Sequence, residues 1–118
     1  MKECLKVTGD CMYPLLQEGD EVLIEPDSRI KMGDVIVFLS NGFLQIHRAL
    51  LVLPNGWILQ KADRLSNYSW IRKEVVVSQV RFIRRENFKI TIDTLRSRLK
   101  GLLSGYKAIV KKNLTKTA

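Results

Sequence analysis

The sequence is poor in the residues that build metal centres and disulfide frameworks. It has one histidine and two cysteines among 118 residues, which are too few good ligands for a metal site and too few thiols for a set of disulfides. A bridge between Cys4 and Cys11 would close only a small loop. We therefore expect two free thiols, as in a reducing compartment, and no cofactor.

The sequence also lacks a long apolar run. No stretch approaches the ~18 uninterrupted apolar residues of a membrane-spanning helix, and the N-terminus has no apolar segment of signal-peptide length. Hydrophobic residues form 46% of the chain and charged residues 27%, which is ordinary for a globular protein. These features predict a compact cytoplasmic protein, and the chain length suits a single core.

Acidic residues are scarce in the last third of the chain. Residues 1–80 carry nine Lys/Arg and ten Asp/Glu, whereas residues 81–118 carry eleven Lys/Arg and two Asp/Glu. The whole net charge of +8 therefore resides in the C-terminal segment. A segment this basic favours an anionic partner such as a phospholipid surface, a nucleic acid or an acidic protein.

Short apolar segments separated by turn signals predict strands. Residues 21–25 alternate apolar and polar positions, residues 35–39 form a β-branched run, and Asn41-Gly42 is typical of a tight hairpin turn. Strands are expected at residues 5–8, 21–25, 35–39, 44–53, 57–62 and 74–83, with a loop at 63–70. Residues 1–90 are therefore predicted to form a mainly β domain, a coiled antiparallel sheet or partly open barrel.

The apolar spacing changes after residue 91. Apolar residues then recur at three- and four-residue steps, the spacing of one helix face. They are Ile92, Leu95, Leu99, Leu102, Leu103, Tyr106, Ile109 and Val110. This pattern predicts a basic amphipathic helix over residues 92–112, within a C-terminal segment 91–118. Its apolar face can pack on the β domain, lie on the inner face of a membrane as a peripheral contact, or bind another partner.

The segment VTGDCMYPLLQEGDEVLI carries the pattern of a reactive site. It resembles the nucleophile box shared by type I signal peptidases and the self-cleaving SOS repressors. The matching residues are Gly9, Cys11, Met12, Pro14, Gly19 and Asp20. Cys11 stands where the family has serine. A thiol at this position is still a nucleophile. Its ordinary pKa of about 8.5 is closer to the pKa of imidazole than the pKa of a serine hydroxyl is.

Two further segments match in family order. IKMGDVIVF followed by LQIHRALL resembles the Gly-Asp strand and His-Arg-Val motif of the endoplasmic-reticulum, archaeal and sporulation-type signal peptidases, in which histidine is the general base. QKADR at residues 60–64 resembles the Thr-Lys-Gly-Asp-Asn motif of the same branch, with Asp63 at the acidic position and Ala62 in place of glycine. The resemblance covers roughly residues 5–83 and implies the signal-peptidase fold and peptidase activity.

The resemblance also implies roles for individual residues. Cys11 would be the nucleophile, His47 the general base, and Asp63 the group that orients the imidazole. The backbone at the turn would supply oxyanion donors, and the residues after it would line the substrate groove. The oxyanion candidates are Gly9, Asp10 and Cys11, and the groove candidates are Met12, Tyr13 and Pro14.

Simpler roles stand beside these. Cys11 can be a small buried hydrophobe, His47 can be a strand histidine bonded to a neighbouring carbonyl, and Asp63 can cap a loop or pair with Arg64 or Lys61. Lys61 is a less favoured alternative base, because a lysine must be desolvated to act near neutral pH. Asp10 and Asp20 are expected to be turn residues, and Met12 a core residue.

The sequence thus predicts a soluble, signal-peptidase-like endopeptidase that cleaves a precursor or leader peptide. One alternative is an inactive peptide-binding module of the same fold. A second is a nucleic-acid-binding or regulatory protein acting through its basic C-terminal region. Nucleic acid is the less favoured partner, because no helix-turn-helix precedes the β domain and the strands lack an aromatic RNA-stacking motif.

Overall fold

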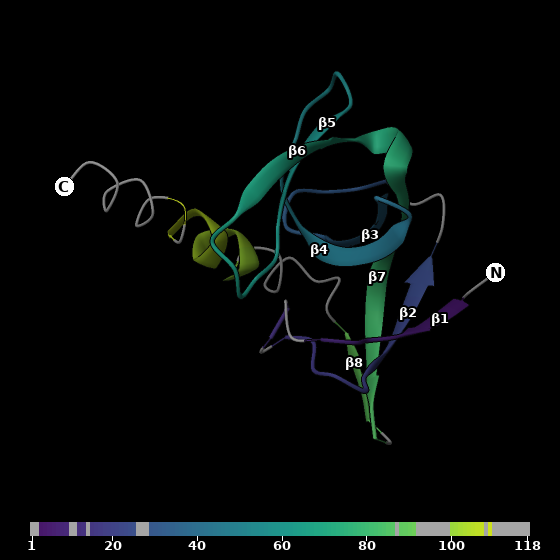
Figure 1. The fold of residues 1–118 in the computed structure, drawn as a ribbon. Helices are drawn as coiled ribbons and strands as arrows, with labels where there is room; N and C mark the ends of the chain where they lie inside the picture. The colour runs from purple at the N-terminus through teal and green to yellow at the C-terminus, as the bar shows by residue number, and fades with distance from the viewer. Residues whose placement is uncertain are drawn as a thin grey trace.

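The computed structural model describes residues 3–9, 12, 13, 15–25, 29–86, 88–91, 100–107 and 109. Strands dominate this part of the chain, and a helix follows at residues 100–107 (Figure 1). The strands are β1 (Glu3–Lys6), β2 (Glu21–Glu25), β3 (Val35–Ser40), β4 (Phe43–Val52), β5 (Trp57–Lys61), β6 (Tyr68–Arg72), β7 (Val76–Arg85) and β8 (Phe88–Thr91). A 3-10 turn, Lys73–Val75, precedes β7.

All eight strands belong to one antiparallel sheet. Its order is β1-β2-β7-β3-β4-β5-β6, and β8 pairs with β7 outside this path. The sheet curls so that β6 arches over β3 and β4 in Figure 1, but it does not close into a barrel. The predicted mainly β fold with a coiled antiparallel sheet and a C-terminal helix is confirmed.

The central strand β3 is buried on both of its faces. Val35 and Val37 belong to one core cluster, and Ile36 and Phe38 to a second cluster on the opposite face. Successive side chains of a strand point to opposite faces, so a strand between two apolar layers needs a continuous apolar run. This explains why residues 35–38 do not alternate with polar residues; Leu39, which follows them, is half exposed.

Two strands were not predicted. β6 begins inside the segment expected to be a loop, residues 63–70, and its side chains are mostly exposed. β8 is exposed along its whole length and pairs with the far end of β7, which continues to Arg85 beyond the expected end at residue 83. Neither strand has the buried alternation on which the prediction of a strand depends.

The C-terminal helix packs on β4. Gly101 and Gly105 are buried, and the Tyr106 hydroxyl donates a 2.9 Å hydrogen bond to the carbonyl oxygen of Leu50. Residues 100–107 therefore pack on the β domain, which was one of the alternatives left open by the sequence. The rest of the predicted helix, apart from residue 109, lies outside the described residues, and contact with a membrane surface stays a prediction.

No helix in the described part of the chain combines the length and the apolar character needed to cross a bilayer.

Candidate active site

A groove of about 530 Å³ separates the N-terminal segment from the first half of β4. Most of the side chains around it are apolar, and His47 is at one end of the β4 wall. The groove is lined by Leu5, Lys6, Val7, Thr8, Gly9, Met12, Leu16, Leu44, Gln45, Ile46, His47 and Leu65. It brings together two of the motifs that the sequence placed far apart, the nucleophile box and the histidine motif.

The β4 wall of this groove has a free backbone edge. Residues 43–48 pair with β3 on one side, but pairing with β5 on the other side begins only at Arg48. Among the described strands, none pairs with the second edge of residues 43–47. Unpaired N–H and C=O groups along a strand can bind an added extended peptide.

The turn that carries the nucleophile box is fixed at both ends. Val7 donates a hydrogen bond to the Asp20 carbonyl at 2.8 Å, and Leu16 donates to the Met12 carbonyl at 2.9 Å. The Met12 side chain is only 3% exposed and belongs to the core, as predicted. Gly9 has a φ of +83°, a conformation that favours glycine.

The structure places some of the predicted residues of this turn in the groove and does not describe others. Gly9 and Met12 line the groove. Tyr13 is 50% exposed and lies outside the groove lining. Cys11, Asp10 and Pro14 lie outside the described residues, so their predicted roles remain predictions.

His47 is held by a glutamine rather than by the expected aspartate. Its Nδ1 lies 2.6 Å from Gln60 Oε1, while Gln60 Nε2 donates to Ser69 Oγ at 2.7 Å. Because Gln60 Oε1 can only accept, Nδ1 carries the proton in this hydrogen bond. In the neutral imidazole, Nε2 is then the free acceptor, which is the form a general base needs.

Burial is the largest influence on the ionisation of His47. It lowers the pKa of His47 below the ordinary 6.5, against the opposing effects of the Gln60 hydrogen bond and the Asp63 charge. The nearby Lys61 ammonium lowers the pKa further. The described residues alone therefore favour the neutral imidazole near pH 7, the form that can accept a proton.

This shift predicts how stability depends on pH. Below the ordinary pKa, 6.5, the unfolded chain protonates its histidine while the folded protein does not. The free energy of unfolding should therefore fall as the pH drops through this value towards the lower pKa of the folded state. Urea denaturation between pH 5 and pH 8, in a Cys11→Ala background that removes a coupled thiol, measures the effect.

His47→Gln in the same background provides the control, because the variant cannot titrate there. Its unfolding free energy should change less across this range. An equal pH dependence in both proteins would show that burial of His47 does not control it. The pKa of Asp20 is also lowered, first by its hydrogen bond to Arg85. Because the ordinary pKa of that carboxyl is 3.8, Asp20 affects the free energy of unfolding only at more acidic pH.

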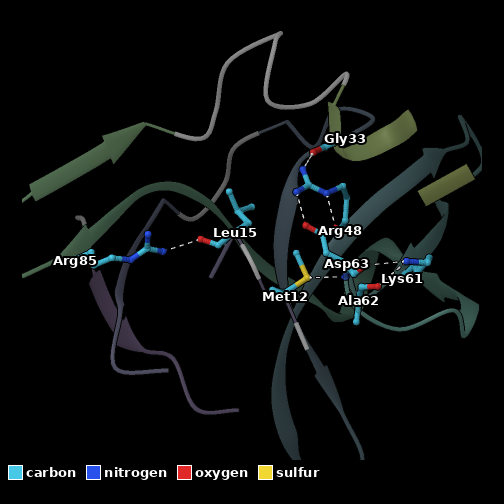
Figure 2. A network of polar contacts seen from close by, with 8 residues as sticks. All are labelled: Met12, Leu15, Gly33, Arg48, Lys61, Ala62, Asp63 and Arg85. Atoms are coloured by element: carbon cyan, nitrogen blue, oxygen red, sulfur yellow. Dashed lines mark hydrogen bonds and ion pairs between the residues drawn. The ribbon is translucent and has the colours of Figure 1, made fainter. Parts of the chain in front are cut away.

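Asp63 binds Arg48 with both carboxylate oxygens. Arg48 Nε donates to Oδ1 at 2.8 Å and Arg48 Nη2 donates to Oδ2 at 2.7 Å, as Figure 2 shows. The side chains are 3% and 16% exposed, respectively. Asp63 was expected to orient His47, but its carboxylate pairs with Arg48, the residue that follows His47, and the ring donates its hydrogen bond to Gln60.

The backbone of Asp63 also connects to the nucleophile box. Its N–H donates to Met12 Sδ at 3.2 Å, and Arg48 Nη1 donates to the Gly33 carbonyl at 2.8 Å. The sequence pointed to Arg48 only as part of the histidine motif and gave no sign of these partners. Arg48 thus joins β4 to the turn before β3 and to the segment after β5.

Lys61 faces away from the groove. Its side chain is 1% exposed, and Nζ donates to the Ala62 carbonyl at 2.8 Å and to the Asp63 carbonyl at 3.3 Å. Burial lowers the pKa of Lys61, but the residue does not line the groove. Of the two candidate bases, His47 and Lys61, only His47 lines the groove.

Asp20 is a turn residue, as predicted, and it has a second partner. It accepts a 2.9 Å hydrogen bond from the Gln17 N–H and binds Arg85 through both oxygens, at 3.0 and 2.8 Å. Arg85 also donates to the Leu15 carbonyl at 3.0 Å. The end of β7 thereby holds the nucleophile turn from the side opposite to Asp63 (Figure 2).

No group of three histidine, cysteine or acidic side chains suited to a metal occurs in the described ranges. Cys4 is a free, exposed thiol.

The described part of the chain is a coiled β domain in which one groove contains a strand histidine and two residues of the nucleophile box, Gly9 and Met12. The comparison with known families identifies the class of protein. The Peptidase S24-like family model matches residues 2–63, more than half of the chain. The protein belongs to the Peptidase S24-like family, and the match includes both His47 and Asp63. No curated protein matches the sequence.

Proposed function

We propose that the protein is a cysteine endopeptidase in which Cys11 is the nucleophile and His47 is the general base. One observation carries this proposal. Gly9 and Met12, which flank Cys11 in the sequence, line the same groove as His47. A nucleophile between them would share that groove with the only imidazole of the chain.

The proposed reaction is acyl transfer. His47 Nε2 takes the proton from the Cys11 thiol, and the sulfur attacks the scissile carbonyl carbon. Backbone N–H groups of residues 9–11 stabilise the oxyanion, and the tetrahedral intermediate collapses when the imidazolium protonates the leaving amine. His47 then deprotonates a water molecule that hydrolyses the thioester, which returns the thiol and releases the acid product.

Gln60 takes the orienting role in this proposal. Its hydrogen bond fixes the Nδ1–H tautomer of His47 and directs Nε2 away from β5. A neutral amide beside the imidazole of a Cys-His pair is a known variant of the triad arrangement. Asp63 would act through Arg48, as a structural partner of the loop and the nucleophile turn.

The groove supports an extended peptide substrate with apolar side chains. Its walls present Leu5 and Val7 on one side, Leu44 and Ile46 on the other, and Leu65 at one end. A peptide added along the free edge of residues 43–47 would direct alternate carbonyl groups to β4 and the others to the opposite side, towards the nucleophile turn. We propose a precursor or leader peptide as the natural substrate, in keeping with the signal-peptidase resemblance.

Alkylation by iodoacetamide tests the Cys11–His47 pair directly. Because Cys4 is exposed and would react as well, the experiment uses a Cys4→Ser background. An isolated thiol is only a few per cent thiolate at pH 7, so transfer of the proton to His47 should speed alkylation of Cys11 about tenfold or more. His47→Ala should remove this acceleration, and Gln60→Ala should reduce it.

Slow alkylation that is the same in the parent and in His47→Ala would contradict the proposal. The unfolded protein in urea supplies the reference rate for an unperturbed thiol. Binding of an extended peptide without any enhanced thiol reactivity would instead support a peptide-binding module of the same fold.

A further inference from the structure

We propose that the C-terminal helix is part of the peptidase site, and that Gly101 is a positioning residue that holds Arg48 against Asp63. The catalytic meaning of this inference rests on the proposed function. The contact itself does not, because it concerns only the described residues of β4, the segment after β5, and the helix.

Gly101 lies directly on the guanidinium of Arg48. A Cβ atom at position 101 would overlap Cζ, Nε and Nη1 of Arg48, and Gly101 is buried. Glycine within a helix is about 1 kcal/mol less favourable than alanine. Since no unusual φ requires glycine at this position, the close approach to Arg48 is the physical reason for it.

The guanidinium has little freedom to move away from a larger residue. It makes three hydrogen bonds, two to the Asp63 carboxylate and one to the Gly33 carbonyl, at 2.7 to 2.8 Å. Asp63 in turn donates its N–H to Met12. Displacing Arg48 would therefore loosen three segments of the site together, including the turn that carries Cys11.

The alternation of β4 puts His47 and Arg48 on opposite faces of the strand. Arg48, which the helix contacts, shares its face with the groove residues Leu44 and Ile46. A second contact of the helix lies one turn further along, where Gly105 fits against the Leu50 side chain. The helix thus contacts β4 at Arg48, the residue that follows His47, and again at Leu50.

The contact between Gly101 and Arg48 should affect the pH at which His47 titrates. Among the described residues, the charged groups that act on the ring are the Asp63 carboxylate and the Lys61 ammonium, and Lys6 lines the other wall of the groove; the thiol of Cys11 is the further titratable group of the proposed site. Arg48 compensates the Asp63 charge. If a larger residue at position 101 displaces Arg48, the uncompensated carboxylate should favour the imidazolium form, and His47 should titrate at a higher pH.

The test compares Gly101→Ala with Gly105→Ala, both in the Cys11→Ala background that removes the coupled thiol, by NMR titration of the imidazole, which is unambiguous because the chain has one histidine. Both variants disturb helix packing, but only the first disturbs Arg48. We expect an upward shift of the His47 titration in Gly101→Ala alone, with Ser104→Ala, at an exposed helix position, matching the parent. Identical titrations in Gly101→Ala and Gly105→Ala would overturn the inference.

The parent protein supplies a second measurement should Gly101→Ala fail to fold. A nuclear Overhauser effect between Gly101 Hα and Arg48 Hε is expected, and its absence would also overturn the inference. Neither measurement needs a substrate. A shifted titration with an unreactive Cys11 would refute the proposed function alone, whereas a reactive Cys11 with an unshifted titration would refute only the role of Gly101.

Discussion

Replacement of Cys11 by alanine is expected to abolish peptide cleavage. The variant lacks the atom that forms the thioester, so the rate should fall by about 10³-fold or more. Incubation with a degenerate peptide library in a reducing buffer, followed by mass spectrometry of the products, detects cleavage whatever the natural substrate is. The groove predicts that cleaved peptides are enriched in apolar residues near the new termini.

Two further variants separate loss of the nucleophile from loss of the fold. Cys11→Ser keeps a hydroxyl nucleophile and should retain a small part of the activity, because His47 must deprotonate a much weaker acid. His47→Ala should lower the rate about 10²- to 10⁴-fold. Undiminished cleavage by Cys11→Ala, at matched thermal stability, would eliminate the proposed mechanism.

Removal of the Arg48 charge is expected to destabilise the protein strongly. Arg48→Met leaves the largely buried Asp63 carboxylate and the Gly33 carbonyl without their donors. Breaking a buried ion pair by removing one partner typically costs about 3–5 kcal/mol. Urea denaturation at pH 7 should therefore show a large fall in the free energy of unfolding.

A double variant and a surface control test whether the loss of stability comes from the unpaired buried charge. Arg48→Met combined with Asp63→Leu removes both charges and should regain much of the lost stability. Arg84→Ala breaks the exposed pair between Arg84 and Glu21 and should change stability by about 0–1 kcal/mol. Equal effects of Arg48→Met and Arg84→Ala would show that the Arg48–Asp63 pair does not hold the site together.

Much of the fold could be predicted because its central strands have strong local patterns. The bounds of β2 match the expected residues 21–25, and β3 and β4 are joined at Asn41-Gly42 as predicted. β6 and β8 were not predicted, because most of their side chains are exposed and neither strand has an alternation of buried and exposed positions. The pairing that makes them strands comes from neighbours distant in sequence.

The site was predictable only in part. His47 could be identified because it is the one histidine and lies in a recognisable motif. Gln60 could not, because its contact with His47 depends on the register of β4 and β5, which shifts between Ala49 and Leu51. A glutamine also has no pattern that distinguishes a ring partner from an ordinary strand residue.

The role of the helix could not be derived from its amphipathic pattern. The apolar positions predicted a packing face, but the closest contacts are made by Gly101 and Gly105, which add nothing to an apolar pattern. At these two positions the absence of a side chain, rather than an apolar side chain, allows the close contact. The basic residues, which suggested an anionic partner, do not indicate this contact.

The two-residue turn at Asn41 and Gly42 has a chemical consequence beyond the hairpin. Both residues have positive φ, and the turn fixes which residue of β4 opposes which residue of β3. One inserted residue would exchange the faces of β4 to which His47 and Arg48 point, so that a guanidinium, which cannot accept a proton, would replace the imidazole on its face of the strand. The length of the Asn41-Gly42 turn thus determines which face of β4 carries the imidazole.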